Sequence, residues 1–485
     1  MKKLDKILTG YDNNGMVFDL GDSIHRIIEP SYFCYAEEVF EIFDNKFLSN
    51  IGIVPTRLVK STKSFTHDKF VISYPYEWPA EMYKDAVLFH INLFLELDKF
   101  SLTFKDALPS NILFNFSHPV FVDFLSIIKT INIDKEKWLV DGYKLNEKRF
   151  AVVEEMLVPY MIIPFLLMED KNYSEARSLL ANKACNMGNE KPGFQDAYKA
   201  GKHDVFENIK HPRAFLKKLQ KLKKAKKYLL VDQATDFKDF LNRLYSFIEK
   251  SDVTPSAGSY VDYYQKKQES FDFSPHHSWE LKQRNIFSIL ENEKPESVLD
   301  VGANTGWFSF LAESLGAKVI SLDIEEDCVN EIYHLAKKGN KNILPLLVAF
   351  DDLTKSYFGI EIFEGNYEGR DYKNTPLFLL PIERFHSDLV LCLGLIHHLI
   401  LGSGYNISQV LEILSQMAKK CLLIEFVSIK DPLVVAEPLF FKSLNQFDST
   451  NYNLDILVSE GKKFFDTVEI FPSHPESRTL VKFSR

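Results

Sequence analysis

The residues with the clearest chemical pattern lie around a glycine turn in the last third of the chain. Ser297–Val301 (SVLDV) is a short apolar run that leads into a turn containing Gly302 and Gly306, and a helix-forming stretch follows. A strand, a glycine turn and a helix place backbone N–H groups around an anionic ligand, and glycine lets a ligand lie directly on the backbone. Lys318–Leu322 is the next predicted strand. Asp323 at its end is placed to accept the ribose hydroxyls of an adenosine.

The spacing of this turn separates two classes of nucleotide site. Proteins that bind NAD carry G-x-G-x-x-G, which cradles a pyrophosphate, whereas this turn is D-x-G-x-x-x-G and begins at Asp300. A carboxylate at the entrance would repel a pyrophosphate, and it would attract the ammonium of a methionine group, directly or through water. The alternative is an ordinary strand–turn–helix connection that binds nothing.

The residues VLDVGANTGWFS, followed by VISLDI, resemble motifs I and II of class I S-adenosylmethionine (SAM)-dependent methyltransferases. The resemblance covers about residues 280–485. It implies a seven-stranded, Rossmann-like α/β domain with an antiparallel final hairpin, and SAM as the cofactor. It also implies cofactor contacts at the turn, at the strand ends and in an upstream lid: Asp300, Gly302, Asn304, Gly306, Asp323, Ile324, Leu393 and Tyr264.

The adenine end of this implied site is less regular. The family often has an acid after the third strand, which here is Ile343–Val348, and that acid holds the adenine amino group. Ala349 stands where the acid is expected, so Asp351 or Asp352 is the candidate.

Candidate catalytic residues follow the fourth and fifth predicted strands, Asp388–Leu393 and Cys421–Phe426. The carboxyl edge of a doubly wound sheet faces the ligand crevice, so we expect His397, His398 and Glu425 near the transferred methyl group or the acceptor. Histidine titrates near neutrality and can act as a general base. The alternatives are a structural histidine pair and a strand-end carboxylate in a hydrogen-bond network. Adjacent histidines without a third ligand nearby predict no metal site.

A second constellation lies near the N-terminus, where KDALPSNILF is followed by VDFL. The spacing of Asp106, Asn111 and Asp123 resembles that of small-molecule kinases, in which such residues orient the hydroxyl and bind two metal ions. The resemblance implies a reduced, α+β kinase-like region with a β-hairpin over Gly15–Ile28 and a site for Mg-ATP. FKD replaces the usual HRD, no glycine-rich loop is visible, and Arg26 or Lys60 would have to replace the usual lysine. An inactive kinase-like region and coincidence are the alternatives.

The motifs KDALPSNILF, SYVDYY, VLDVGANTGWFS and RTLVKF also occur in this order in large bacterial methyltransferases of the nodulation type. That resemblance covers most of the chain. It implies that the N-terminal region belongs with the transferase, and the nodulation label suggests a glycan acceptor.

These motifs must be positioned by more than one core, because 485 residues exceed an ordinary single domain. We expect a kinase-like α+β region over 1–130, a helical region over 131–250 and, after the turn-rich Ser251–Gly258, the SAM methyltransferase domain over 259–485. Lys210–Lys227 reads as a basic amphipathic helix, which either binds RNA, anionic lipid or an acidic partner or is a solvated face.

The composition limits which binding partners and which cellular compartment we expect. The net charge of -9 gives no overall attraction to nucleic acid or anionic membrane. Five scattered cysteines without CxxC spacing fit a reducing compartment. No apolar stretch follows Met1–Asp5 and the longest apolar run is too short to span a bilayer. We therefore expect a cytoplasmic protein without a signal peptide or a transmembrane segment. The oligomeric state is open.

Three hypotheses follow from the sequence. The first is a SAM-dependent methyltransferase that acts on an oxygen or nitrogen nucleophile of a small-molecule or glycan acceptor. The second is a kinase-like phosphotransferase with an accessory SAM-binding domain. The third is a scaffold that binds SAM without turnover.

Overall fold

The computed structural model divides the chain into two units, and each is described here by itself. Unit 1 comprises Met1–Pro255 and Phe358–Phe378, and unit 2 comprises Ser256–Tyr357 and Leu379–Arg485. The three-domain boundaries expected from the sequence stay a prediction. The structure describes residues 6–9, 14–43, 50–135, 149–185, 236–255, 271, 273, 279–354, 362–363, 366–367, 370–371, 375–376, 379–436 and 451–485.

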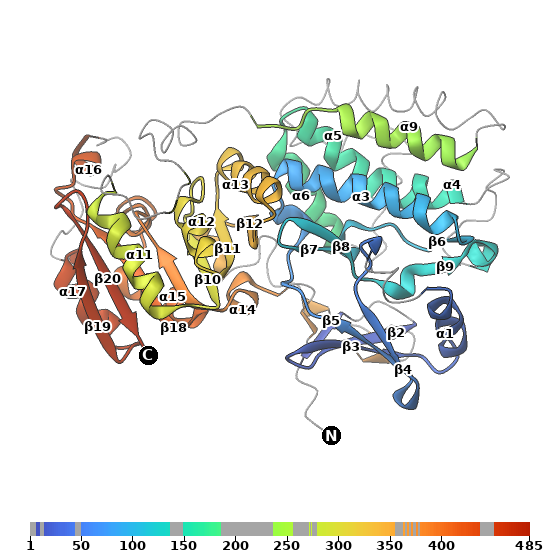
Figure 1. Ribbon diagram of the computed structural model, residues 1–485, viewed down its shortest axis with the longest axis horizontal. Coiled ribbons are helices and arrows are strands. Elements are labelled where there is room, and N and C mark those ends of the chain that lie inside the picture. The colour runs from blue at the N-terminus through green and yellow to red at the C-terminus, as the bar shows by residue number, and fades with distance from the viewer. Residues whose placement is uncertain are drawn as a thin grey trace. The chain divides into compact units, whose positions relative to one another are not determined.

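Unit 1 begins with a five-stranded antiparallel sheet in the order β1-β2-β3-β5-β4 (Figure 1). The hairpin of β2 and β3 confirms the one predicted over Gly15–Ile28. Helix α1 follows β3 and precedes β4. The bounds are β1 (Lys6–Thr9), β2 (Gly15–Asp19), β3 (Ser23–Ile28), α1 (Phe33–Glu41), β4 (Thr56–Val59) and β5 (Ser64–Asp68).

The second part of unit 1 is built around α3 (Ala80–Asp98), whose buried residues recur every three or four positions and form one broad face of the helix. Two short antiparallel pairs follow: β6 (Leu102–Phe104) with β9 (Ile127–Lys129), and β7 (Ile112–Asn115) with β8 (His118–Phe121). These pairs carry the segment with the kinase-like motif.

The described residues after position 148 in unit 1 are mainly helical, and their helices gather beside α3 in Figure 1. The apolar run near position 160 lies in this group and is largely buried. The helices are α4 (Arg149–Val152), the π-helical η6 (Val153–Ile162), α5 (Ile163–Glu169), α6 (Tyr173–Cys185) and α9 (Phe237–Lys250). Two short antiparallel pairs belong to the segment at 358–378: β13 (Ile362–Phe363) with β16 (Thr375–Pro376), and β14 (Asn366–Tyr367) with β15 (Arg370–Asp371).

Unit 2 contains one seven-stranded sheet in the order β12-β11-β10-β17-β18-β20-β19. The first five strands of this order are parallel, and β20 runs antiparallel to both of its neighbours. The predicted seven-stranded sheet and its final hairpin are therefore confirmed. The strands are β10 (Ser297–Val301), β11 (Lys318–Asp323), β12 (Ile343–Leu347), β17 (Ser387–Cys392), β18 (Ala418–Val427), β19 (Thr467–Pro472) and β20 (Arg478–Ser484).

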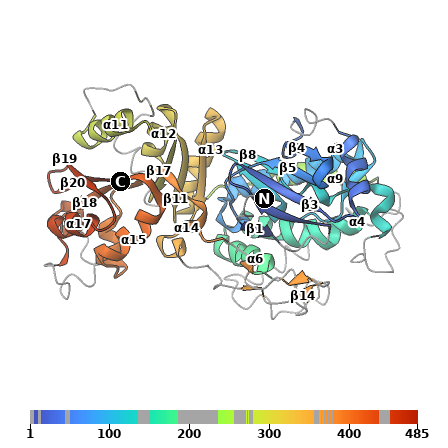
Figure 2. The same ribbon diagram turned by 90° about the horizontal axis from the view of Figure 1, so that it is seen from below.

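Helices cover both faces of this sheet, as Figure 2 shows. One layer holds α11 (Leu281–Glu293), α12 (Trp307–Ser314) and α13 (Glu326–Gly339), and the other holds α14 (Pro381–Arg384), α15 (Ile407–Met417) and α17 (Leu454–Gly461). Short helices η8 (Phe350–Leu353), η9 (His398–Gly402) and α16 (Pro432–Ala436) follow β12, β17 and β18. Strands covered on both faces lose their contact with water, which explains why β17 is buried along its whole length and apolar from Leu389 to Cys392.

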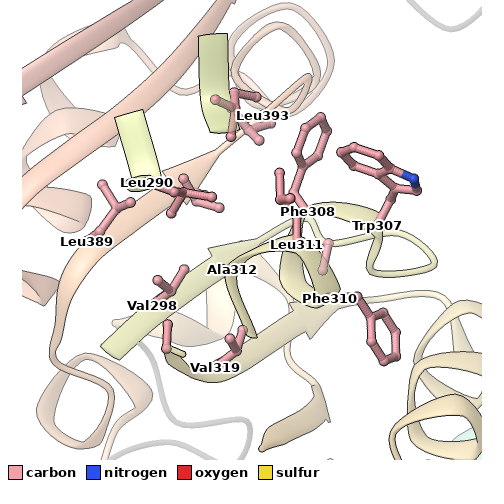
Figure 3. Close-up of a cluster of buried hydrophobic side chains, with 14 of the residues drawn as sticks. Leu290, Val298, Trp307, Phe308, Phe310, Leu311, Ala312, Val319, Leu389 and Leu393 are labelled. Carbon is pink, nitrogen blue, oxygen red and sulfur yellow. The ribbon is translucent and has the colours of Figure 1, made fainter. Parts of the chain in front are cut away.

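The core beneath the first layer joins α11 and α12 to the centre of the sheet (Figure 3). Aliphatic side chains from β10, β11 and β17 belong to one buried cluster with Trp307, Phe308 and Phe310 of α12. Burial of one such side chain stabilises the fold by about 1.5–3 kcal/mol. Trp307 is 1% exposed, so it belongs to the core that fixes the first turn of α12 beside β10.

None of the helices in the described parts of the chain is both long enough and apolar enough to cross a membrane.

Candidate cofactor-binding site

The loop between β10 and α12 is tied to the neighbouring strand by its own backbone. The N–H groups of Gly302 and Ala303 both donate to the carbonyl of Leu322, at 2.8 and 3.0 Å. Gly302 and Gly306 have φ angles of 79° and 82°. A Cβ at Gly302 would come within 3.0 Å of Leu395, and one at Gly306 within 2.8 Å of Ile332. Both positions therefore require glycine, which keeps the loop flat against the carboxyl edge of the sheet.

Asp323 is the acceptor around which this loop is arranged. Its Oδ2 accepts from the N–H of Asn304 at 2.7 Å, and its Oδ1 accepts from those of Ile324 and Glu325 at 2.7 and 3.1 Å. Burial raises the pKa of Asp323, and the three amides act in the opposite direction. A carboxylate offers about four acceptor positions, so Oδ2 keeps capacity for one further donor while the loop stays bound.

Asp300 faces the helix layer. It is 2% exposed, and its Oδ2 accepts from the hydroxyl of Ser309 on α12 at 2.7 Å. The Ser309 hydroxyl is in turn 2.8 Å from that of Ser321 on β11. Burial raises the pKa of Asp300 to about 6. This chain of contacts couples the end of β10 to α12 and β11, and a direct role toward a ligand ammonium stays a prediction.

The remaining predicted cofactor contacts lie around these two acids. Ile324 is 65% exposed beside Asp323 and offers an apolar surface. Asp351 is exposed and accepts from the hydroxyl of Tyr405 at 2.5 Å, and Asp352 donates its N–H to the carbonyl of Ala349. Leu393 is buried at the end of β17, and Tyr264 lies outside the described residues.

The histidine pair follows β17 at the same edge of the sheet. Gly394, with a φ of 65°, turns the chain after the strand, and the rings of His397 and His398 lie 4.1 Å apart between centroids. Burial lowers the pKa of His397 to about 3, and the charges of His398 and Arg478 act in the same direction. His397 is therefore neutral near pH 7, the form in which a histidine can accept a proton.

Glu425 lies near this pair, and its contacts are those of a buried ion-pair network. It is 0% exposed. Its Oε2 is 2.7 Å from Nζ of Lys282, and its Oε1 accepts from Ser473 at 2.8 Å. Arg478 lies 4.0 Å from Glu425 and binds Asp431 through two hydrogen bonds.

Sequence reasoning missed the cations and Asp431 in this network. Lys282 lies inside a helix with no motif around it, and Arg478 opens the last strand. The one signal was the arginine at the start of the last strand.

The kinase-like residues of unit 1 come together in a second cluster. Asp106 Oδ1 accepts from the side-chain amide of Asn111 and from the hydroxyl of Ser126, both at 2.6 Å. Asp123 accepts from Arg26 of β3 at 2.6 Å. The N–H of Val122, next to Asp123, donates to the carbonyl of Asn111, which links the two halves of the cluster.

Of the two expected lysine replacements, it is Arg26 that contacts Asp123. Lys60 instead pairs with Glu37 of α1 at 2.6 Å. Across the described ranges, no group of three or more histidine, cysteine, aspartate or glutamate side chains is arranged to hold a metal ion.

Comparison with known proteins gives one curated relative. The chain is 27% identical over 379 residues to nodulation protein NoeA of Rhizobium meliloti (strain 1021). The matched region covers 75% of this chain and 70% of NoeA. The resemblance to nodulation-type bacterial proteins is confirmed by this match. No family model matches the chain.

Solved structures match at lower identity. They include monomeric WbdD, at 16% identity and a TM-score of 0.28 over 43% of this chain and 42% of that one. Magnesium protoporphyrin IX methyltransferase from Synechocystis PCC 6803, with bound S-adenosylhomocysteine, matches at 17% and 0.26 over 42% and 81%. TehB from Haemophilus influenzae matches at 14% and 0.29 over 46% and 66%. The chain thus spans about two fifths of the length of the WbdD structure.

Proposed function

We propose that this chain is a SAM-dependent methyltransferase that transfers a methyl group to an oxygen or nitrogen nucleophile of a small-molecule or glycan acceptor. The observation that carries the proposal is the joint geometry of the β10–α12 loop and Asp323. Two glycines at positive φ, where a Cβ would also crowd Leu395 and Ile332, and an acid with one remaining acceptor position lie together at the carboxyl edge of a parallel sheet.

The residues fit the two ends of an adenosine. Asp323 Oδ2 has capacity for a ribose hydroxyl, and the exposed Ile324 offers an apolar face to adenine. Asp351, which already binds Tyr405, is the candidate acceptor for the adenine amino group, with Asp352 as the alternative. We expect Asn304 and Leu393 to line the site through the loop and the end of β17.

For methyl transfer the protein mainly has to position the two reactants. Bound SAM supplies an activated methyl group, so proximity and alignment provide most of the rate. In this proposal His397 accepts a hydrogen bond from the acceptor and orients it, because a pKa lowered to about 3 leaves the ring neutral but too weak a base to take the proton. In this proposal Glu425 holds Lys282 and Ser473 in place, because its two oxygens already accept hydrogen bonds from these residues.

Two variants test the cofactor site in the full chain. We expect Asp323→Ala and Gly302→Arg each to lower the affinity for SAM at least about tenfold, because a ribose acceptor is removed or the backbone surface is covered. Isothermal titration with SAM and S-adenosylhomocysteine measures this. Gly316→Arg is the matched control, because Gly316 also has a positive φ but has open space around it.

Unaltered SAM affinity in both site variants would refute the site. A chain that binds SAM but transfers no labelled methyl group to any member of a panel of glycan and small-molecule acceptors would favour the scaffold hypothesis.

A second candidate function belongs to unit 1, because Asp106, Asn111 and Asp123 are linked into one cluster with Arg26. This arrangement supports a kinase-like site for Mg-ATP, with Arg26 in place of the usual lysine. We expect wild-type chain to bind Mg-ATP in isothermal titration and Asp123→Asn to lose at least about tenfold in affinity. Asp68→Asn, which breaks an exposed pair with Arg57 in the same sheet, should have no effect. If wild-type chain binds no Mg-ATP, this candidate fails.

A further inference from the structure

One histidine in the antiparallel sheet of unit 1 has a ring nitrogen that is buried without a partner. His67 lies on β5 and is 3% exposed. Its Nδ1 is 3.0 Å from the hydroxyl oxygen of Thr56 on β4, whereas its Nε2 has no hydrogen-bond partner in the described part of the chain. A buried polar atom without a partner costs free energy, and native structures keep few of them. Nε2 of His67 is therefore a candidate contact for a ligand.

The contacts of Thr56 determine which nitrogen of this ring carries the proton. The Thr56 hydroxyl donates to the carbonyl of Val54 at 2.8 Å. A hydroxyl has one hydrogen, so toward His67 this oxygen accepts and Nδ1 is the donor. Burial and, after it, the charge of Arg26 lower the pKa of His67 to about 3, which keeps the ring neutral near pH 7. Nε2 is therefore an acceptor, and its ligand must bring an N–H or O–H donor.

His67 lies on the face of the sheet that is turned toward the kinase-like cluster. β3 and β5 are antiparallel, with Arg26 directly opposite Phe65, two positions before His67 (Figure 1). Side chains two positions apart on a strand lie on the same face, so these three residues share one face. The ring of Phe65 packs edge to face on that of Phe124, with centroids 5.0 Å apart. Phe124 follows Asp123, which is the partner of Arg26.

One ligand can reach both His67 and the pair of Arg26 with Asp123. Diagonal neighbours on paired strands are about 7–8 Å apart, and Arg26 and His67 stand in this relation. A nucleotide carries its base at the opposite end from its phosphates. Phosphates beside Arg26 and Asp123 therefore leave the base to reach His67, and the amino group of adenine supplies the donor that Nε2 lacks.

We propose that Nε2 of His67 accepts a hydrogen bond from the amino group of adenine in a nucleotide bound to unit 1, and that Thr56 is the positioning residue that holds the ring and its tautomer. This inference rests on the second candidate function and assigns the part of that site that selects the base.

The test compares two nucleotides that differ at one group. Purine riboside 5′-triphosphate has a hydrogen atom where ATP has the amino group. In isothermal titration of the full chain with the magnesium complexes, wild type should bind ATP about tenfold more tightly than this analogue, because the analogue leaves Nε2 without a donor. His67→Phe should lower the affinity for ATP about tenfold and change that for the analogue less than about twofold.

The matched control is the neighbouring histidine of the same sheet. His25 lies next to Arg26 on β3, and successive side chains of a strand point to opposite faces. His25→Phe should therefore leave both affinities unchanged. His67→Phe removes a buried nitrogen and leaves the hydrogen bond of Thr56 to Val54 in place, so we expect this variant to fold.

Thr56→Val tests the positioning role. It keeps the shape of the side chain and removes the acceptor of the Nδ1 proton, so the preference for ATP should fall below about threefold while the affinity for the analogue stays the same. A purely structural role of Thr56 would weaken both nucleotides alike.

Equal effects on the two nucleotides, or none on either, in folded His67→Phe would overturn the assignment of His67. A wild-type chain that binds neither nucleotide would refute the second candidate function itself, and the inference with it, so the two failures are distinguishable.

Discussion

His397 lies where a base for a methyl acceptor is expected, but its burial makes it a weak one. It lies at the carboxyl edge of β17, and burial keeps it neutral by lowering its pKa to about 3. A general base works best when its pKa lies near the working pH, and burial disfavours the imidazolium that would form on His397. The environment of His397 therefore favours a neutral ring that accepts a hydrogen bond from the acceptor and orients it.

This environment can be measured without knowing the acceptor. In the NMR spectrum of full chain labelled at histidine Cε1, we expect the His397 signal to stay constant between pH 5.5 and 8. His397→Gln identifies that signal by its disappearance. A titration with a midpoint near 6.5 would show that the ring is solvated, and it would contradict the role of His397 as a neutral ring that orients the acceptor.

At the level of the elements, the strands of unit 2 were predictable because central parallel strands read as continuous apolar runs. β10 has the predicted bounds, Ser297–Val301. β18 begins at Ala418, three residues before the predicted Cys421. Its first residues include the exposed Lys419 and Lys420, which interrupt the apolar pattern by which the strand was recognised. The pattern of apolar residues along the sequence predicts which part of a strand is buried. It does not predict the part of a strand that extends beyond the core.

The contacts between elements were harder to predict from the sequence. The kinase-like resemblance implied the β2–β3 hairpin, yet the pairing of β3 with β5 joins strands separated by a helix and another strand. Lys282 and Glu425 are 143 positions apart, and neither position alone indicates the other. Arg26 was named as a replacement for the kinase lysine, but its partner Asp123 lies 97 positions away. Strand-end residues can be read from the sequence, whereas their partners depend on the topology.

On the scale of the whole molecule, the two units respond to acid in different ways. In unit 1, burial lowers the pKa of both His67 and His90 to about 3. Neither ring nitrogen of His90 has a hydrogen-bond partner among the described residues, and the ring packs against Phe94, Phe104 and Phe121. Between about pH 6.5 and 3 the unfolded chain binds protons that these native histidines do not, so the free energy of unfolding falls as the pH falls.

In unit 2 two shifts oppose each other. His397 behaves like the histidines of unit 1, but the pKa of Asp300 is raised to about 6. Native Asp300 therefore binds a proton between about pH 6 and 4 that the unfolded chain lacks, and this proton stabilises the unit as the pH falls. The burial of Asp323 acts in the same direction as that of Asp300. The two effects offset each other down to about pH 4.

Acid should therefore separate the unfolding of the two units. Each shifted histidine changes the free energy of unfolding by up to about 1.4 kcal/mol per pH unit, so unit 1 should lose about 3 kcal/mol per pH unit below pH 6 while unit 2 stays nearly constant. Urea unfolding of the full chain at pH 7 and pH 5 measures this. His90→Leu should halve the slope of the acid-sensitive transition, because it removes one of the two histidines, whereas His118→Leu, at an exposed position, should leave it unchanged. If both transitions shift equally with pH, the buried histidines of unit 1 do not govern its acid stability. In that case the opposite pKa shifts of His397 and Asp300 also do not protect unit 2 against acid.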